Sequence, residues 1–306
     1  GRSLYISLHG GGGAPAEVND QQWENQKRLY SPNEGIYLSP RAPTNTWNLW
    51  HQGHIDRAFD RLIANMIVFH QVDPNHVYLL GYSAGGDGVY QLAPRMADRW
   101  AAAAMMAGHP NDARPDSLRN LPFTLHMGAK DSPYNRNGQA QIWKDLLAKL
   151  RANDPNGYDH WVEIYADKGH WMDREDSQAI PWLASKYRNL RSTKIIWLQD
   201  DVVHSRFYWL LDKTPKARER VEATLDGQKI TISTSENHDT LTVRLDDSMM
   251  DLNQPVSIAV NDNKVMTFEA VRKIGTLLKT MSERGDPLGM FSSEIEFPIT
   301  QTSTED

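Results

Sequence analysis

A serine flanked by glycines two residues away on either side is the strongest chemical signal in this sequence. Gly81-Tyr82-Ser83-Ala84-Gly85 fits the pattern G-x-S-x-G, with a strand-like run, His76–Leu80, before it and a helix-forming run, Gly86–Met96, after it. A serine on a tight strand-to-helix turn adopts a strained backbone, and small neighbours let other segments pass close by. The pattern predicts a nucleophile at Ser83, with the N–H of Ala84 as a donor to a negatively charged oxygen.

A run of glycines directly after the first strand-like segment is a second candidate for binding that oxygen. In His9-Gly10-Gly11-Gly12 the glycines allow a backbone N–H to approach a substrate carbonyl with no Cβ in the way. The candidate donors are Gly10 and Gly11, and His9 is a candidate for substrate binding. The alternatives are a flexible terminal loop and a phosphate cradle, but neither G-K-[ST] nor a helix-opening G-x-G-x-x-G is present.

A serine hydroxyl becomes a nucleophile only with a base and a carboxylate beside it. In the chain order typical of this motif, the acid and then the histidine follow the serine. Asp131 and His170 each stand in a loop after a strand-like run, where a side chain can reach the edge of a sheet. The alternatives for the acid are Asp112, Asp116 and Asp167, and the other histidines after the serine are His109, His126, His160, His204 and His238.

Three side chains near these groups are candidates for holding a substrate. Tyr82 precedes the serine, Trp171 follows the histidine and would form one wall of a pocket, and His109 follows the strand-like run Trp100–Ala107. Each has a simpler structural explanation, since aromatic residues commonly pack in a core and loop histidines are often structural.

His51, His54 and Asp56 superficially resemble a set of metal ligands. Their spacing does not match H-E-x-x-H, and no third cluster of ligands accompanies them. The segment more simply opens a helix, with Asp56 near its positive end. We predict neither a metal ion nor a cofactor, because a Ser-His-Asp hydrolase needs neither.

The elements that must position these residues alternate between strand-like and helical runs up to about residue 191. Apolar and β-branched runs predict strands near residues 4–8, 36–40, 76–80, 100–107, 122–127 and 160–165. Helical spacing predicts helices near residues 56–68, 86–96, 138–150 and 176–187. The alternation predicts an α/β fold, with a mostly parallel sheet covered by helices on both faces.

The pattern changes after residue 191. Between residues 194 and 268, about seven short runs rich in Ile, Val, Thr, Tyr and Trp are separated by turn signals such as Asp226-Gly227 and Asn261-Asp262-Asn263. They predict a small β-sandwich or sheet. We therefore expect two domains, a catalytic one over residues 1–191 and a β-rich accessory one over residues 192–306.

A helix and a polar tail are predicted to close the chain. Apolar residues at helical spacing predict an amphipathic helix over residues 271–284, with Ile274, Leu277, Leu278 and Met281 on its apolar face. The tail from Thr300 to Asp306 is polar, and we expect it to be frayed.

The bulk composition limits the possible partners. Of the 306 residues, 40% are hydrophobic and 24% charged, which is typical of globular proteins. The net charge of −6 and the lack of a basic stripe count against nucleic acid. No apolar run approaches the ~20 residues that a membrane span requires.

The chain has no cysteine, which excludes disulfides, thiolate metal sites and cysteine nucleophiles. Cytoplasmic and periplasmic or secreted locations stay equally open. The start at Gly1 without Met suggests that an upstream segment, such as a signal peptide, was removed.

Together these residues resemble the esterase branch of the α/β-hydrolases. The resemblance is carried by His9–Gly12, Asp73–Gly86, Gly128–Asp131 and Gly169–Trp171, and it covers roughly residues 4–190. The branch includes polyhydroxybutyrate-depolymerase-like, feruloyl-esterase-like and phospholipase/carboxylesterase-like proteins. Such proteins usually have further strands before the His-Gly-Gly strand, which this sequence lacks, and the β-rich part is not matched to a known function.

The resemblance implies a triad of Ser83, Asp131 and His170, an acyl-enzyme route and an oxyanion site at His9–Gly12. We therefore expect hydrolysis of a carboxylic ester in a small-molecule or polymer-borne substrate. Two other functions stay open, a serine peptidase of the same fold and a non-catalytic binding module with a degenerate site. The sequence indicates no oligomeric state.

Overall fold

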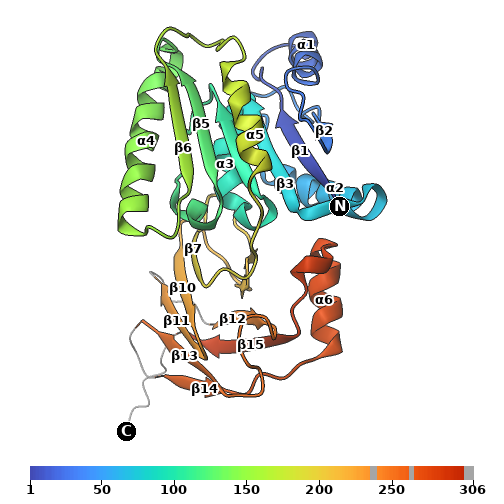
Figure 1. Ribbon diagram of the computed structural model, residues 1–306, viewed down its shortest axis with the longest axis vertical. Helices are drawn as coiled ribbons and strands as arrows, with labels where there is room; N and C mark the ends of the chain where they lie inside the picture. The colour runs from blue at the N-terminus through green and yellow to red at the C-terminus, as the bar shows by residue number, and fades with distance from the viewer. Residues whose placement is uncertain (235–239, 262–264, 300–306) are drawn as a thin grey trace. The chain divides into compact units, whose positions relative to one another are not determined.

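The computed structural model describes residues 1–234, 240–261 and 265–299. Its chain divides into two compact units, Gly1–Asn189 and Leu190–Asp306 (Figure 1). The predicted tail from residue 300, His238 and most of the predicted turn after Asn261 lie outside the described residues.

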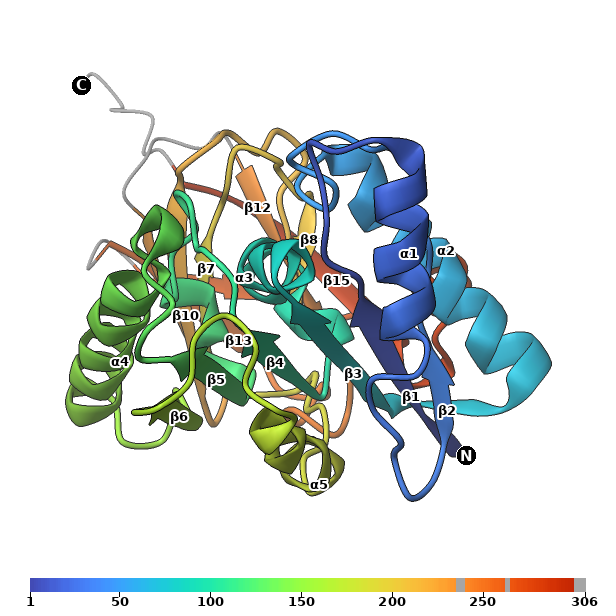
Figure 2. The ribbon, with the colours of Figure 1, turned by 90° about the horizontal axis from the view of Figure 1, so that it is seen from above.

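The first unit is built on a six-stranded parallel sheet. Its strands are ordered β2-β1-β3-β4-β5-β6, and every neighbouring pair is parallel. Figure 2 shows α2, α3 and α4 on one face and α5 on the other, which confirms the α/β class. The strands are β1 (Arg2–Leu8), β2 (Ile36–Leu38), β3 (Val72–Tyr82), β4 (Ala102–Met106), β5 (Phe123–Gly128) and β6 (His160–Tyr165). The helices are α1 (Ala16–Gln26), α2 (Gly53–His70), α3 (Ala84–Arg95), α4 (Arg136–Asn153) and α5 (Ala179–Ala184).

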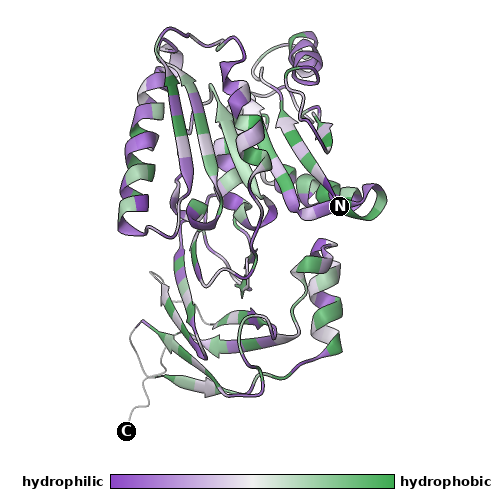
Figure 3. Cartoon of the chain, in the orientation of Figure 1, coloured by the Kyte–Doolittle hydropathy of each residue, from purple (hydrophilic) through white to green (hydrophobic). Residues whose placement is uncertain are grey.

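The burial of each strand follows from its composition. All five residues of β4, three alanines and two methionines, are buried, as expected for a central strand covered on both faces. The edge strand β6 alternates hydrophobic and hydrophilic residues and is mostly half-buried (Figure 3). The central strands are therefore hydrophobic runs, and the candidate site residues Ser83, Asp131 and His170 come after the ends of β3, β5 and β6.

Most predicted elements of the first unit are present, with two differences. The predicted helix at residues 176–187 is a short 3₁₀ turn, Glu175–Gln178, followed by α5, where Pro181 occupies the first turn and breaks no hydrogen bond. Helix α1 was not predicted. Its sequence, AEVNDQQWENQ, has no apolar stripe, and the residues that it buries are Asn19 and Gln26.

The described residues of the second unit form two sheets, as expected for a β-rich segment. One has the order β14-β13-β11-β10-β7 and the other β15-β12-β9-β8. In β10 the buried residues alternate with half-buried ones along the strand, which is the pattern of a sheet with one covered face. The strands are β7 (Lys194–Leu198), β8 (Arg206–Phe207), β9 (Leu210–Leu211), β10 (Arg220–Asp226), β11 (Lys229–Thr234), β12 (Thr240–Leu245), β13 (Val256–Val260), β14 (Met266–Phe268) and β15 (Ser293–Pro298).

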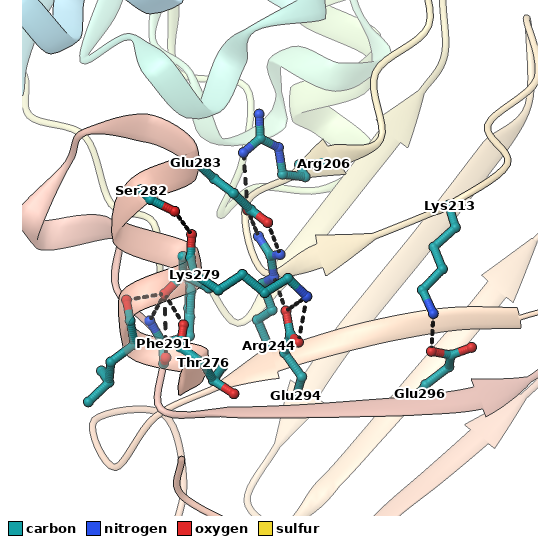
Figure 4. A network of polar contacts seen from close by, with 12 residues as sticks. Arg206, Lys213, Arg244, Thr276, Lys279, Ser282, Glu283, Phe291, Glu294 and Glu296 are labelled. Carbon is teal, nitrogen blue, oxygen red and sulfur yellow. Dashed lines mark hydrogen bonds and ion pairs between the residues drawn. The ribbon is translucent and has the colours of Figure 1, made fainter. Parts of the chain in front are cut away.

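Helix α6 (Ile274–Arg284) is held by its polar residues, and not by the predicted apolar face. Ile274 and Leu278 are exposed, while Thr276 and Thr280 are buried. Figure 4 shows a network of ion pairs between the helix and the four-stranded sheet. Glu283 pairs with Arg244 at 2.7 Å and with Arg206 at 3.0 Å, and Lys279 pairs with Glu294 at 2.8 Å.

Among the described residues, no helix is both long enough and apolar enough to cross a membrane.

Candidate active site

Ser83 stands at the corner between β3 and α3, in a backbone conformation that few residues adopt. Its φ is 59° and its ψ is −124°, and its N–H donates to the carbonyl of Met106 at 2.9 Å. A Cβ on Gly85 would lie 2.0 Å from the carbonyl oxygen of Leu8, and one on Gly81 would lie 2.3 Å from that of Gly85. Both positions therefore require glycine, because backbone passes directly against them.

A chain of hydrogen bonds runs from Ser83 through His170 to Asp131. His170 Nε2 lies 2.9 Å from Ser83 Oγ, and His170 Nδ1 lies 2.7 Å from Asp131 Oδ2. The Asp131 side chain is fully buried, whereas that of His170 is 43% exposed. When Nδ1–H donates to the carboxylate, the lone pair of Nε2 faces the serine hydroxyl. In this geometry a proton can pass from Ser83 Oγ to His170 Nε2.

The loops that carry Asp131 and His170 pack directly on each other. Lys130 N–H donates to the carbonyl of Lys168 at 2.9 Å. A Cβ on Gly128, the last residue of β5, would lie 2.0 Å from the carbonyl oxygen of Gly169. This close approach explains how Asp131 and His170 meet although 39 residues separate them. Of the alternative acids, Asp112 accepts a hydrogen bond from Gln91 and Asp167 pairs with Lys130.

The glycine loop after β1 lies against Ser83. A Cβ on Gly10 would lie 3.1 Å from Ser83 Cβ and 3.6 Å from Ser83 Oγ. The φ angles of Gly11, Gly12 and Gly13 are 102°, 82° and 59°, all in the region that favours glycine. The loop thus brings backbone next to Ser83 by a path that side chains would block.

Few backbone N–H groups remain to bind an oxyanion beside Ser83. The N–H of Gly12 already donates to Asn19 Oδ1 at 2.7 Å, and the N–H of Gly13 donates to the carbonyl of Asn45 at 2.9 Å. The N–H groups of Gly10 and Gly11 are therefore the candidate donors from the loop. Ala84 is the first residue of α3, where N–H groups have no intrahelical acceptor. Donors from two segments can then converge on one oxygen.

His9, a predicted substrate-binding residue, lies buried beside the glycine loop. Nδ1 lies 2.6 Å from the carbonyl oxygen of Gly10, and Nε2 accepts the N–H of Ala42 at 3.0 Å. The imidazole donates at one nitrogen and accepts at the other, so it is neutral, and burial lowers the pKa of His9 to about 4. Because the residue is 0% exposed, its ring is a structural support of the loop and has no surface for a substrate.

Tyr82 and Trp171 line the same cleft as Ser83. The hydroxyl of Tyr82 donates to the carbonyl of His170 at 2.6 Å and accepts the N–H of Met172 at 3.1 Å. Burial raises the pKa of Tyr82, which keeps this hydroxyl protonated and able to donate. Tyr82 therefore anchors the loop that carries His170, while half-exposed Trp171 lines the cleft.

His109 is turned toward the backbone around it, and the described residues that line the cleft do not include it. The backbone N–H of His109 donates to Asp87 Oδ1 at 2.6 Å, and its ring Nδ1 accepts the backbone N–H of Asn111 at 2.9 Å. Burial lowers the pKa of His109. Burial also raises the pKa of Asp87, one turn after Ser83 on α3, to about 6.

Arg136 and Asn19 are residues of the site that the sequence analysis missed. A guanidinium nitrogen of Arg136 lies 3.6 Å from Asp131 Oδ1, the carboxylate oxygen that does not face His170. Asn19 of α1 is buried and hydrogen-bonded to the glycine loop. Neither belongs to a short motif, so spacing along the chain gave no signal for them.

A cleft of about 640 Å³ opens over Ser83 and His170. This volume is typical of small-molecule sites. A neighbouring cavity of about 600 Å³ shares Arg28, Leu29 and Arg174 with it. Besides the glycine loop and the residues already described, the cleft is lined by Val18, Gln22, Asn25, Gln26, Arg28, Leu29 and Arg174.

The His51–Asp56 segment begins α2 and is engaged in packing. Asp56 is buried and forms an ion pair with Arg95 at 2.6 Å. Within the described ranges, no group of three or more His, Asp or Glu side chains is placed to hold a metal ion.

Comparisons with known proteins connect this geometry to hydrolases. The family model described as "Dienelactone hydrolase family" matches residues 33–196, a range that contains Ser83, Asp131 and His170. The bifunctional acetylxylan esterase/xylanase XynS20E of Neocallimastix patriciarum is 26% identical over 185 residues, which are 55% of this chain and 27% of that protein. The putative esterase NocK of Nocardia uniformis subsp. tsuyamanensis is 30% identical over 125 residues, which are 38% of this chain and 36% of that protein.

The matched segments thus span only about a third or less of these curated relatives. Among solved structures, a thermostable esterase is similar with a TM-score of 0.47 and 17% identity, over 61% of this chain and 55% of that chain.

Proposed function

This chain belongs to the dienelactone hydrolase family of the α/β-hydrolase superfamily, and from that membership we propose that it is a serine esterase that cleaves carboxylic esters through an acyl-enzyme on Ser83. The single observation that supports this most is the hydrogen-bonded chain from Ser83 Oγ to His170 Nε2, at 2.9 Å, and from His170 Nδ1 to Asp131, at 2.7 Å. Family membership supports the hydrolase class, and this chain of contacts supports the mechanism.

In the proposed first half-reaction, Ser83 Oγ attacks the ester carbonyl while His170 Nε2 takes its proton. The carbonyl oxygen becomes negative and accepts hydrogen bonds from the N–H of Ala84 and from an N–H of Gly10 or Gly11. His170 then returns the proton to the oxygen of the leaving alcohol, and the C–O bond of the ester breaks. The acyl group stays on Ser83.

In the second half-reaction, water attacks the acyl carbonyl and His170 Nε2 takes a proton from it. Collapse of the tetrahedral intermediate releases the carboxylic acid and returns the proton to Ser83 Oγ. Asp131 accepts the hydrogen bond of His170 Nδ1–H throughout, so the ring keeps the tautomer in which Nε2 is the base. No metal or cofactor takes part in this sequence of steps.

The lining of the cleft counts against one kind of peptidase. A peptidase that grips a free N-terminal amine needs carboxylates beside the nucleophile, and none occurs among the described residues that line the cleft. The similarity to a protein named acetylxylan esterase/xylanase extends the proposal to polymer-borne esters with small acyl groups. The groups that act lie in the first unit, so we propose that residues 1–191 form the catalytic domain and residues 192–306 an accessory domain.

The first test is hydrolysis of p-nitrophenyl acetate, butyrate and octanoate by wild type and by Ser83→Ala. We expect the substitution to lower kcat by at least roughly 10⁴-fold, because no other group supplies the nucleophile. Ser185→Ala, which removes an exposed hydroxyl on the same unit, is the matched control and should keep wild-type activity. A fluorophosphonate probe should label wild type and the control, but not Ser83→Ala.

Unchanged ester hydrolysis by Ser83→Ala would refute the proposed nucleophile. A wild type that cleaves an aminoacyl p-nitroanilide but not the esters would identify a peptidase. A wild type that neither hydrolyses these substrates nor reacts with the probe would favour the binding module.

A further inference from the structure

Asn19 uses every hydrogen-bonding group of its side chain on the glycine loop and its exit. Its Oδ1 accepts the N–H of Gly12 at 2.7 Å. Its Nδ2 donates to the carbonyl of Ala14 at 2.9 Å and to the carbonyl of Pro15 at 3.1 Å. The residue is 0% exposed, so water cannot replace these contacts. The side chain therefore cross-links the middle of the loop to the segment that leads into α1.

The loop needs such a cross-link because glycine does not restrict its own backbone. Gly11, Gly12 and Gly13 all have positive φ, and glycine populates positive and negative φ about equally. A second tie, from Gly13 N–H to the carbonyl of Asn45, holds the far end of the loop at 2.9 Å. A Cβ on Gly11 would lie 2.5 Å from Asn19 Oδ1, so the side chain also forms the wall behind this glycine. Asn19 thus restrains the loop at Gly12, the residue directly after the Gly10 and Gly11 amides.

We infer that Asn19 is a positioning residue for the oxyanion site, which fixes the Gly10 and Gly11 N–H groups beside Ser83 without touching the substrate. The inference rests on the proposed function, since it deepens the role of the glycine loop in that reaction. Donors stabilise a developing oxyanion only when they are already aimed at it, and small displacements cost a large part of their effect. Loss of Asn19 should therefore impair the chemical step more than substrate binding.

Two substitutions separate the contacts of Asn19. Asn19→Asp is isosteric and keeps an acceptor for the Gly12 N–H, but it places a carboxylate oxygen against the carbonyls of Ala14 and Pro15. Asn19→Leu removes all three contacts. Asn65→Asp is the matched control, because it makes the same amide-to-carboxylate change on an exposed side chain of another helix, α2.

For p-nitrophenyl acetate we expect both Asn19 variants to lose roughly 10- to 100-fold in kcat, with KM changed by less than about threefold. The rate of labelling by a fluorophosphonate should fall in parallel, because its transition state also places negative charge on an oxygen beside Ser83. The final labelled fraction should match wild type, since it counts molecules that keep Ser83 and His170 assembled. Asn65→Asp should behave as wild type in every measurement.

A kcat of Asn19→Asp within threefold of wild type would overturn the inference. A loss of kcat that is proportional to a smaller labelled fraction would also overturn it, because such a loss would come from unfolded molecules and not from misplaced N–H donors. An effect confined to KM would place Asn19 in substrate binding and would also contradict it. Failure of the proposed function looks different, since wild type itself would then show neither hydrolysis nor labelling, and both ideas would fall.

Discussion

Ser83 combines an unfavourable backbone conformation with an unusually well-fixed neighbourhood. A non-glycine residue at φ 59° and ψ −124° costs on the order of 1–3 kcal/mol, which the surrounding structure must offset. The stabilisation that offsets this cost comes from the hydrogen bond between the Ser83 N–H and the Met106 carbonyl, and from the close backbone packing that Gly81 and Gly85 allow. The turn thus holds the hydroxyl 2.9 Å from His170 Nε2. At the scale of the residue, the backbone of the turn decides where the serine hydroxyl lies.

Asp87 offers a test of burial near the nucleophile. Burial raises its pKa from 3.8 to about 6, so the folded protein keeps a proton there that the unfolded chain releases. The stabilisation by this group is therefore complete below about pH 4 and is lost as the pH rises through 6. Asp87→Asn keeps an acceptor for the N–H of His109 and removes the charge. We expect it to raise the free energy of unfolding by about 1–2 kcal/mol at pH 8 and by little at pH 4.

Urea denaturation at the two pH values measures this difference. Asp145→Asn, at an exposed position on α4, is the control and should change stability by less than about 0.5 kcal/mol at either pH. Equal effects of Asp87→Asn at pH 4 and pH 8 would show that the burial of the charge is not what matters.

The elements of the first unit bring distant residues together at one edge of the sheet. In a parallel sheet the carboxyl ends of all strands lie on the same edge, and ligand sites form there. The glycine loop follows β1, Ser83 follows β3, Asp131 follows β5 and His170 follows β6. The order of these strands in the sheet, and not their order in the chain, decides which loops touch.

Gly128 is the point at which the loops of Asp131 and His170 touch, and it provides a test at this scale. Gly128→Ala would place a Cβ 2.0 Å from the carbonyl oxygen of Gly169, so the two loops must separate. We expect kcat/KM for p-nitrophenyl acetate to fall by roughly 100-fold, because the Asp131–His170 contact of 2.7 Å depends on this packing.

The same substitution at Gly275 is the control for Gly128→Ala. Gly275 lies in α6, and a Cβ there would meet nothing within 4 Å. Gly275→Ala should leave activity unchanged and stabilise the protein by up to about 1 kcal/mol, since alanine is the better helix former. Retained activity in Gly128→Ala would mean that the two loops can shift without separating the acid from the base.

At the scale of the whole molecule, buried histidines make stability depend on pH. Both ring nitrogens of His126 are hydrogen-bonded, one to the hydroxyl of Thr124 and the other to the hydroxyl of Tyr165, each at 2.9 Å. Burial lowers the pKa of His126 to about 3. Burial lowers the pKa of His9 to about 4. In the unfolded chain both rings take up a proton near pH 6.5, which the folded protein excludes. Their contribution to stability is therefore complete above pH 6.5 and is lost as the pH falls below it.

We expect the free energy of unfolding to fall by at least about 2 kcal/mol between pH 7 and pH 4.5, even though Asp87 acts in the opposite direction over part of this range. Denaturant titrations across this range measure the fall. His126→Gln, which keeps polar groups but does not titrate, should show a weaker dependence on pH than wild type. A stability that is constant from pH 7 to pH 4.5 would contradict the burial of these rings as neutral groups.

The sequence by itself determined the local chemistry and the fold class. G-x-S-x-G with a strand before it and a helix after it predicted the corner at Ser83, and the alternation of strands and helices predicted a parallel sheet. The strand predicted at residues 160–165 coincides with β6. The comparisons confirm the superfamily, while the catalytic roles of Ser83, Asp131 and His170 stay predictions that the three tests of activity address. These features are encoded locally, since a strand, a turn and a helix start depend mostly on neighbouring residues.

Only the tertiary structure decided which polar groups meet. It buried His9 against Ala42, put Arg136 beside Asp131 and placed Asn19 against the glycine loop. Helix α1 escaped prediction because the residues that it buries are polar and its sequence shows no apolar stripe. A hydrophobic pattern records which face of an element avoids water, but the partner of a buried polar side chain comes from a segment elsewhere in the chain, and no local pattern specifies it.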